Sequence, residues 1–337
     1  MMTLDNRISA FVALGDYLRA LPEEELAYLA RRAGQFNNFF DLANVTSALD
    51  GIALMLQRDS LEQWVAQYQL NPQTPKKVGV VMAGNIPAVG FHDALCVLLS
   101  GHILQARLSS EDPFLLRALL SKLIEIEDRF ATQVQFVEML KESDAIIATG
   151  SDNTARYFEY YFAKKPHIIR KNRTSVAVLN GQETAEELAA LGQDILRYYG
   201  LGCRNVAKAF VPQGYDFTAF FEAIQPQQTV LDHHKYQNNY DYNKSIFLVN
   251  RVPHLDNGFL LVTESTNLVS PISVLFYETY ADEQDLHQKL TAIQDKLQCV
   301  VSSGGQRTDS FAFGQAQCPS VQDYADGVDT LQFLSTL

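Results

Sequence analysis

Short apolar runs, each followed by a turn and then a helical segment, constrain the fold of this chain more than any other feature. They occupy residues 78–82, 103–108, 134–137 and 144–150. Strands that alternate with helices predict an α/β fold with a mostly parallel sheet covered on both faces. Ligands bind such sheets beyond the carboxyl ends of the strands, so we expect a binding edge at the turns near Asn85, Arg107 and Gly150.

The segments on either side of this pattern have a different character. Residues 1–75 are helical in periodicity, with apolar side chains such as Phe11, Leu14 and Leu18 at helical spacing. Later apolar runs predict further strands at residues 167–170, 175–179, 245–249, 259–262 and 273–276. The chain is therefore expected to hold more than one α/β substructure.

Composition and charge exclude several classes of function. The 337 residues carry a formal net charge of -12, which argues against a nucleic-acid partner because such proteins present a basic face. No signal-peptide pattern or membrane-length apolar run is visible, and we expect no stable membrane insertion. The four cysteines show no paired spacing, which argues against a zinc site or a disulfide framework and fits a cytoplasmic protein.

Cys203 is the strongest candidate for chemistry. It follows Gly200, Leu201 and Gly202, precedes Arg204, and leads into an apolar run at residues 206–212. Small residues before a thiol let a ligand approach the sulfur, and a thiol in a tight turn beside a basic residue is a candidate nucleophile. From these residues alone, a structural cysteine in a loop is the alternative.

These turns and the thiol together carry a resemblance to a known family. The chain resembles the acyl-CoA reductases of the bacterial luminescence type, a branch of the aldehyde dehydrogenase superfamily, over roughly residues 78–335. Five segments support it in the same order along the chain: residues 84–87, 105–113, 148–151, 202–212 and 271–274. The resemblance implies an aldehyde-dehydrogenase-like fold with a helical N-terminal segment, a Rossmann-like cofactor-binding domain, an α/β catalytic domain and a C-terminal segment that returns to the cofactor domain or to a subunit interface. These four parts would span residues 1–75, 76–180, 181–315 and 316–337.

The resemblance also implies the roles of individual residues. Cys203 would be the nucleophile, and the side-chain amide of Asn85 would stabilise the oxyanion. The residues expected at the cofactor are Arg107, Ser109, Ser110, Gly150, Ser151 and Asn267. No metal is implied.

Departures from the family pattern shape the expected reaction. Ile169 stands where hydrolytic aldehyde dehydrogenases carry a glutamate, so no base is expected to activate water and the acyl group should exchange with a thiol. Ser110 replaces the carboxylate that holds the ribose hydroxyls in NAD-dependent members, and Arg107 replaces the cofactor lysine. A serine with an arginine nearby favours NADPH. Asn267 stands where a ribose-binding glutamate is expected.

The expected function is therefore NADPH-dependent reduction of an acyl thioester, acyl-CoA or an acyl carrier protein thioester, to the aldehyde through an acyl-enzyme on Cys203. An acyltransferase or thioesterase using the same cysteine, or a non-catalytic acyl-binding or assembly subunit, are the alternatives. Acyl chain length and oligomeric state, a homodimer included, stay open.

The polar and aromatic run at residues 232–244 leaves two interpretations. It is an ordered loop or subunit contact, or it lies at the acyl or CoA entrance, where His233 and His234 would contact the substrate. Adjacent histidines point in different directions, so they do not predict a metal site.

Overall fold

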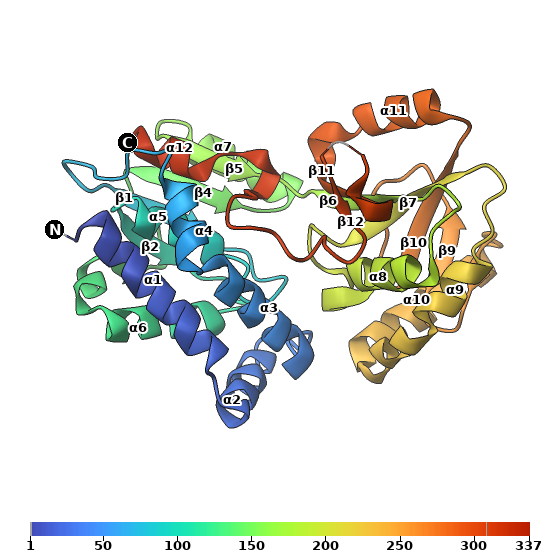
Figure 1. Cartoon of the computed structure of the whole chain (residues 1–337), viewed down its shortest axis with the longest axis horizontal. Helices are drawn as coiled ribbons and strands as arrows, with labels where there is room; N and C mark the ends of the chain where they lie inside the picture. The colour runs from blue at the N-terminus through green and yellow to red at the C-terminus, as the bar shows by residue number, and fades with distance from the viewer. Residues whose placement is uncertain (1, 308) are drawn as a thin grey trace. The chain divides into compact units, whose positions relative to one another are not determined.

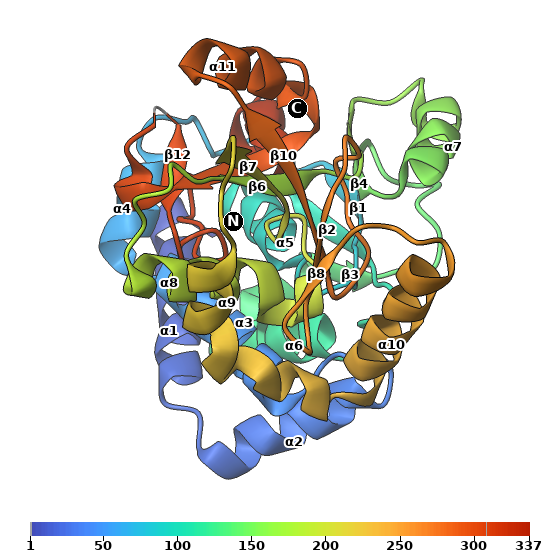
Figure 2. The ribbon, with the colours of Figure 1, turned by 90° about the vertical axis from the view of Figure 1, so that its right-hand side faces the viewer.

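The computed structural model describes residues 2–307 and 309–337, and the chain forms two compact units (Figure 1; turned by 90° in Figure 2). The first unit contains the chain up to Asn172 together with Pro319–Leu337, and the second contains Arg173–Cys318. The boundary lies before the strand at Thr174–Val178, which belongs to the second unit's sheet and not to the domain of residues 76–180 in which the sequence analysis placed it.

A five-stranded parallel sheet forms the centre of the first unit, in the order β3-β2-β1-β4-β5. Its strands are β1 (Lys77–Val81), β2 (Ile103–Arg107), β3 (Val134–Phe136), β4 (Ala145–Thr149) and β5 (His167–Arg170). The connections contain α5 (Phe91–Leu99), α6 (Leu115–Ile126), the short η1 (Asp128–Thr132) and α7 (Asp152–Phe162). The parallel sheet and the alternation of strands and helices confirm the predicted fold class.

Four helices precede this sheet and share its core. They are α1 (Leu4–Arg19), α2 (Glu23–Gly34), α3 (Leu42–Met55) and α4 (Arg58–Val65). Phe11 of α1 is fully buried, and its ring meets the edges of Phe91 at 6.4 Å and of Phe130 at 5.8 Å between centroids. Aromatic pairs in this geometry stabilise a core beyond the area that they bury, so they tie the N-terminal helices to the sheet.

The C-terminal segment, with η6 (Ala325–Gly327) and α12 (Thr330–Ser335), also belongs to the first unit. The indole N–H of Trp64 donates to the Tyr324 hydroxyl at 2.8 Å, and the Tyr68 hydroxyl donates to Asp329 at 2.8 Å. Arg170 at the end of β5 donates to Thr330 at 2.8 Å. These bonds join the end of the chain to α4 and to the sheet.

A seven-stranded sheet forms the second unit, in the order β12-β11-β6-β7-β10-β9-β8, parallel except for the pairing of β8 with β9. The strands are β6 (Thr174–Val178), β7 (Val206–Pro212), β8 (Leu255–Asp256), β9 (Leu261–Glu264), β10 (Val274–Tyr280), β11 (Leu297–Ser302) and β12 (Ser310–Ala312). The α-helices are α8 (Ala185–Leu196), α9 (Thr218–Ile224), α10 (His234–Val249) and α11 (Glu283–Thr291). The short helices are η2 (Arg197–Gly200), η3 (Gln225–Asp232), η4 (Gln294–Lys296) and η5 (Ser303–Gly305). In both views α11 lies on one side of this sheet, and α8 and α9 lie on the other.

The segment from residue 232 to residue 249 corrects two predictions. Residues 245–249 are the last turns of α10 and not a strand, and the polar run at residues 232–244 is mostly helix and not a loop. Tyr236, Tyr240 and Asn243 recur at helical spacing and are buried, whereas most of the polar side chains between them face solvent. Burial of this one helical face therefore decides the structure of the whole segment, including the apolar residues 245–249 that resemble a strand.

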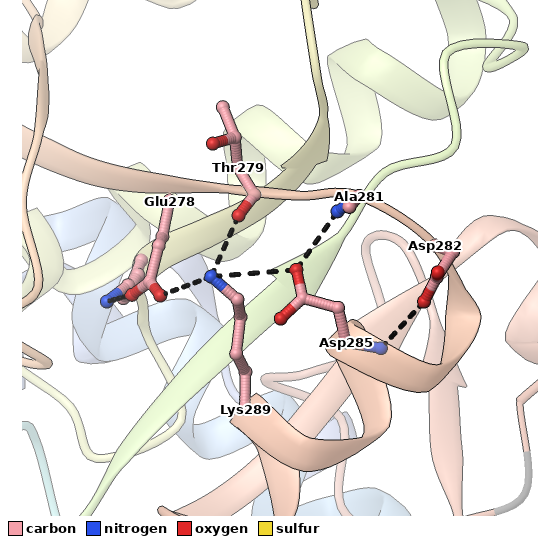
Figure 3. A network of polar contacts seen from close by, with 7 residues as sticks. Glu278, Thr279, Ala281, Asp282, Asp285 and Lys289 are labelled. Carbon is pink, nitrogen blue, oxygen red and sulfur yellow. Dashed lines mark hydrogen bonds and ion pairs between the residues drawn. The ribbon is translucent and has the colours of Figure 1, made fainter.

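A charged network lies between β7, β10 and α11 and neutralises a buried lysine. Lys208 is only 2% exposed, and its ammonium lies 2.5 Å from Glu278. Lys289 donates to the other oxygen of Glu278 at 2.8 Å and to the Thr279 carbonyl at 3.0 Å (Figure 3). Charged groups persist in a protein interior when they are paired in this way.

Within the part of the chain that the structure describes, no helix combines the length and the apolarity needed to cross a bilayer.

Candidate functional site

Cys203 lies in a four-residue turn, Gly202 to Asn205, that leads directly into β7. The backbone N–H of Asn205 donates to the Gly202 carbonyl at 3.0 Å. In the opposite direction the Gly202 N–H donates to the side-chain oxygen of Asn205 at 2.8 Å. Cys203 and Arg204 are therefore the central residues of a turn that is closed from both ends, and Cys203 is half-buried there.

The backbone just before this turn is strained. After α8 the chain passes through Tyr198 (φ 52°), Tyr199 (φ 56°) and Gly200 (φ 79°), all in the left-handed region. This region costs roughly 1–2 kcal/mol for each residue that is not glycine. Something in the surroundings must hold the two tyrosines there.

Asn205 supplies part of that support. Its side-chain nitrogen lies 3.1, 3.3 and 2.6 Å from the carbonyl oxygens of Asp194, Ile195 and Arg197, respectively. Carbonyls at the end of a helix have no partners within the helix. The side-chain nitrogen of Asn205 therefore satisfies carbonyls at the end of α8, and its side-chain oxygen closes the turn that carries Cys203.

Ser175 at the start of β6 holds the other side of Cys203. Its fully buried hydroxyl donates to the Cys203 carbonyl at 3.0 Å. The backbone N–H of Cys299 in β11 donates in turn to the Ser175 hydroxyl at 3.2 Å. Two strands of the sheet thus fix the carbonyl of the candidate nucleophile.

Asp194 and Arg204 anchor the chain after β12 beside this turn. Each carboxylate oxygen of Asp194 accepts one backbone N–H, from Gly314 at 2.6 Å and from Ala316 at 3.1 Å. Burial nevertheless raises the pKa of Asp194 to about 6. Arg204 donates to the Ala316 carbonyl at 3.2 Å, so the turn's own arginine binds the same segment.

The other predicted residues of the second unit lie in different surroundings. The His233 ring packs against Tyr199 in a tilted arrangement with 4.5 Å between centroids, which brings His233 next to the strained segment before Cys203. His234 is exposed at the first position of α10. Asn267 is exposed after β9, and its N–H donates to the Ser265 hydroxyl at 3.1 Å.

The predicted cofactor residues of the first unit lie at one edge of its sheet. β2, β1 and β4 are parallel neighbours, so the turns that follow them share the carboxyl edge. These turns carry Asn85, Ser109, Ser110, Gly150 and Ser151, and Arg107 is the last residue of β2. Asn85, Arg107, Ser110 and Ser151 are exposed there. The prediction that the turns meet at one edge is confirmed by the strand order, whereas the role of each residue stays a prediction.

The turn that carries Asn85 is packed tightly against the turn after β2. A Cβ added to Gly84 would lie 2.6 Å from the Ser109 hydroxyl, so only glycine fits without a shift. Ala88 has a φ of 53°, and its N–H donates to the Asp112 carboxylate at 2.8 Å. Asn37 donates to the Gly84 carbonyl at 3.2 Å. The backbone on both sides of Asn85 is therefore fixed.

Asp112 links that turn to α6. Its second carboxylate oxygen accepts the Leu115 N–H at 3.0 Å, which satisfies a donor at the start of the helix. The side chain is 1% exposed, and burial raises its pKa to about 6.

The donors at this edge suit the phosphates of a nucleotide cofactor. Arg107 supplies an exposed guanidinium, which binds phosphate through charge-assisted hydrogen bonds. Ser151 caps α7 by accepting the Thr154 N–H at 3.3 Å, and the N-terminus of a helix attracts anions. The residues present therefore fit the phosphates of a nucleotide cofactor.

The two sheets and the turns beyond their strands define a fold of the aldehyde dehydrogenase type. An Escherichia coli NADP-dependent enzyme is 15% identical with a TM-score of 0.66, over 94% of this chain and 76% of that one. The protein Gox0499, studied for cofactor and substrate selection, is 12% identical with a TM-score of 0.65, over 90% of this chain and 77% of that one. A Mycobacterium tuberculosis aldehyde dehydrogenase complexed with NAD+ is 14% identical with a TM-score of 0.63, over 89% of this chain and 73% of that one. At these identities the similarity shows the fold alone.

The family follows from the sequence itself. Residues 19–224, more than half of the chain, match the model of the acyl-CoA reductase (LuxC) family. The chain belongs to this family, which confirms the resemblance and supports an oxidoreductase with an acyl reductase or dehydrogenase role. No curated protein matches the sequence.

Three residues that hold the two turns were not predicted from the sequence: Ser175, Asn205 and Asp112. Asn205 and Asp112 lie inside segments that the resemblance singles out, and Asn and Asp are typical of turns and helix starts. Ser175 gave no such signal, because its partners Cys203 and Cys299 are 28 and 124 positions away.

Proposed function

We propose that this protein is an NADPH-dependent reductase that converts an acyl thioester, acyl-CoA or an acyl carrier protein thioester, to the aldehyde. The acyl group is carried on Cys203. The observation that supports this best is the closed turn that presents Cys203, in a chain that belongs to the acyl-CoA reductase family.

The first step is attack of the Cys203 thiolate on the thioester carbonyl. The carbon–sulfur bond to the carrier breaks, the carrier leaves as a thiolate, and a new thioester joins the acyl group to Cys203. The Cys203 carbonyl is bound by Ser175 and the Gly202 N–H by Asn205. The Cys203 N–H lies between these two anchored groups and donates to the oxyanion that forms.

The resemblance assigns the side-chain amide of Asn85 to the same oxyanion. Removing one such donor typically lowers kcat by 10²–10³. We therefore expect Asn85→Ala to slow acylation by about that factor. Asn37→Ala is a useful comparison, because it removes the bond to the Gly84 carbonyl, and the bond that Asn37 accepts from the Phe39 N–H, while the Asn85 amide stays in place.

The cofactor supplies hydride when it is bound. Arg107 would bind its 2′-phosphate through its positive charge, and Ser110 lacks the negative charge that would repel this phosphate. Arg107→Ala should lower kcat/KM for NADPH more than for NADH. Lys164→Ala, which removes an exposed positive charge elsewhere in the same unit, is the control. An equal loss with both cofactors would contradict the assignment.

The acyl-enzyme should persist in water. Ile169 in β5 occupies the position of the missing glutamate, and a general base typically contributes about 10²–10⁴-fold. Acyl-CoA alone should then release close to one equivalent of CoA in a burst, followed by a slow phase. NADPH should restore turnover and yield aldehyde.

Mass spectrometry after incubation with acyl-CoA, without NADPH, tests the proposal directly. We expect one acyl adduct on Cys203 in the wild type and in Cys318→Ala, which removes an exposed thiol, and none in Cys203→Ala. Rapid release of free fatty acid without NADPH would favour a thioesterase. The absence of any adduct across a panel of acyl chain lengths would favour a non-catalytic subunit.

A further inference from the structure

We infer that Asn205 is a positioning residue for Cys203: its side chain holds the nucleophile turn in the orientation that acylation requires. The inference rests on the proposed function in taking Cys203 as the nucleophile. It adds a residue that acts through another and does not itself touch the acyl group.

The two peptide planes on either side of Cys203 are both fixed by hydrogen bonds. The Gly202 carbonyl accepts the Asn205 N–H, and this fixes the plane that contains the Cys203 N–H. The Cys203 carbonyl accepts the Ser175 hydroxyl, and this fixes the following plane. With both planes held, the directions of the Cys203 N–H and of its Cα–Cβ bond are determined.

The Asn205 side chain extends this control to the preceding residue and to the end of α8. Its oxygen accepts the Gly202 N–H, and its nitrogen donates toward carbonyls of Asp194, Ile195 and Arg197. Asn205 is 3% exposed, so these bonds form away from competing water. They connect the nucleophile turn to a helix end across the strained segment at Tyr198 and Tyr199.

Only an amide of this length both accepts the Gly202 N–H and donates to the carbonyls at the end of α8. Aspartate would retain the acceptor for the Gly202 N–H but would place a negative charge against the carbonyl oxygens of the α8 end. Alanine removes both functions while the backbone bond from Asn205 to Gly202 remains. The turn can therefore still form in Asn205→Ala, with the Gly202 N–H and the end of α8 released.

The test compares two reactions of Cys203 that differ in their need for orientation. Acylation by p-nitrophenyl acetate requires attack on a carbonyl and an aligned N–H donor; it forms the Cys203 thioester and releases p-nitrophenolate. Alkylation by iodoacetamide forms a carbon–sulfur bond, releases iodide and needs no oxyanion donor. Both are measured in a Cys318→Ala background, because Cys96 and Cys299 are buried.

We expect Asn205→Ala to lower the rate of the p-nitrophenolate burst by about 10- to 100-fold, since small misplacement of reacting groups has effects of this size. The burst amplitude should stay near one per chain, and the alkylation rate should change by less than about threefold, because the thiol remains accessible. Asn238→Ala, an exposed asparagine of α10, is the matched control and should change neither rate.

Each outcome decides between the explanations. A merely structural role would lower the burst amplitude and leave its rate unchanged, because fewer molecules would be folded. Wild-type acylation rates in Asn205→Ala would overturn the inference. If that variant does not fold, Ser175→Ala removes the second anchor and should give the same slow burst of full amplitude; a normal burst rate there would overturn the inference.

The same assay separates the two proposals. If the wild type is acylated by p-nitrophenyl acetate but not by any acyl-CoA, the proposed substrate is wrong while the positioning of Cys203 is still tested. If Cys203 reacts with neither acyl donor, both proposals are refuted.

Discussion

Replacing Asp112 by asparagine should change how the stability of the first unit depends on pH. The carboxylate is almost fully buried, and its two oxygens accept the N–H groups of Ala88 and Leu115. Burial is the largest influence and raises its pKa from 3.8 to about 6, although the backbone hydrogen bonds act in the opposite direction. The ionised form is therefore stabilised less in the folded protein than in water.

The sign and size of the effect follow from proton linkage. Because the folded state binds this proton more tightly than the unfolded state, the free energy of unfolding falls as pH rises from 3.8 through 6. With a pKa of about 6, complete ionisation of Asp112 lowers the free energy of unfolding by ~3 kcal/mol. About 1 kcal/mol of this loss occurs between pH 5 and pH 7. Asparagine does not titrate, and its NH2 group would face one of the two N–H groups, at a loss of about 1–3 kcal/mol at every pH. The stability deficit of Asp112→Asn should therefore be about 1 kcal/mol larger at pH 5 than at pH 7.

Urea unfolding at pH 5, 6 and 7 measures this deficit. Trp64 is the single tryptophan, it is fully buried in the first unit, and its fluorescence reports that unit. Subtracting the variant from the wild type removes groups common to both, such as His102, whose pKa is lowered by burial. Glu111→Gln, an exposed neighbour, is the control. A deficit that is constant, or that grows toward pH 7, would show that the hydrogen bonds outweigh burial at Asp112 and would refute the reasoning.

Two further predictions concern the second unit. In thermal unfolding, Glu278→Gln should destabilise this unit more than Lys208→Met. The first variant leaves two ammonium groups without their shared carboxylate, whereas in the second Glu278 keeps Lys289 as its partner. We expect a loss of about 3–5 kcal/mol for Glu278→Gln and a smaller loss for Lys208→Met, and the reverse order would contradict this account. His233→Ala should raise KM for acyl-CoA several-fold because its ring packs on Tyr199 beside the nucleophile turn, whereas the exposed His234→Ala should not; equal effects in steady-state kinetics would remove His233 from the substrate site.

The strands of the first unit could be predicted because each has a signal of its own. Val78 and Val80 are buried in β1, and the strand is followed at once by the turn at Gly84 and Asn85. The error at residues 245–249 has a different cause. The helical state of that segment depends on contacts with residues distant in the sequence: Asn243 donates to the Ile272 carbonyl just before β10 at 3.0 Å, and Tyr240 packs with Leu261 and Val274. Such contacts leave no trace in a short window of sequence.

Membership of a sheet is harder to predict than the existence of a strand. The apolar residues 175–179 correctly predicted a strand, but β6 pairs with β7 and β11, which lie later in the chain. A local pattern records that a segment is buried on both faces and not which strands lie beside it. The boundary between the two units was consequently placed after this strand when it lies before it.

The residues that place a nucleophile are hidden for a related reason. A reacting thiol must be reached by its substrate, so it lies in a turn, and the glycines around Cys203 make that turn visible in the sequence. The groups that orient it must be shielded from water to hold their geometry, so they lie in the core, as Ser175 and Asn205 do. A buried serine at the start of an apolar strand looks like an ordinary core position. Sequence patterns of this kind therefore reveal a candidate nucleophile before the residues proposed to orient it, and those become identifiable only when their hydrogen-bond partners are known.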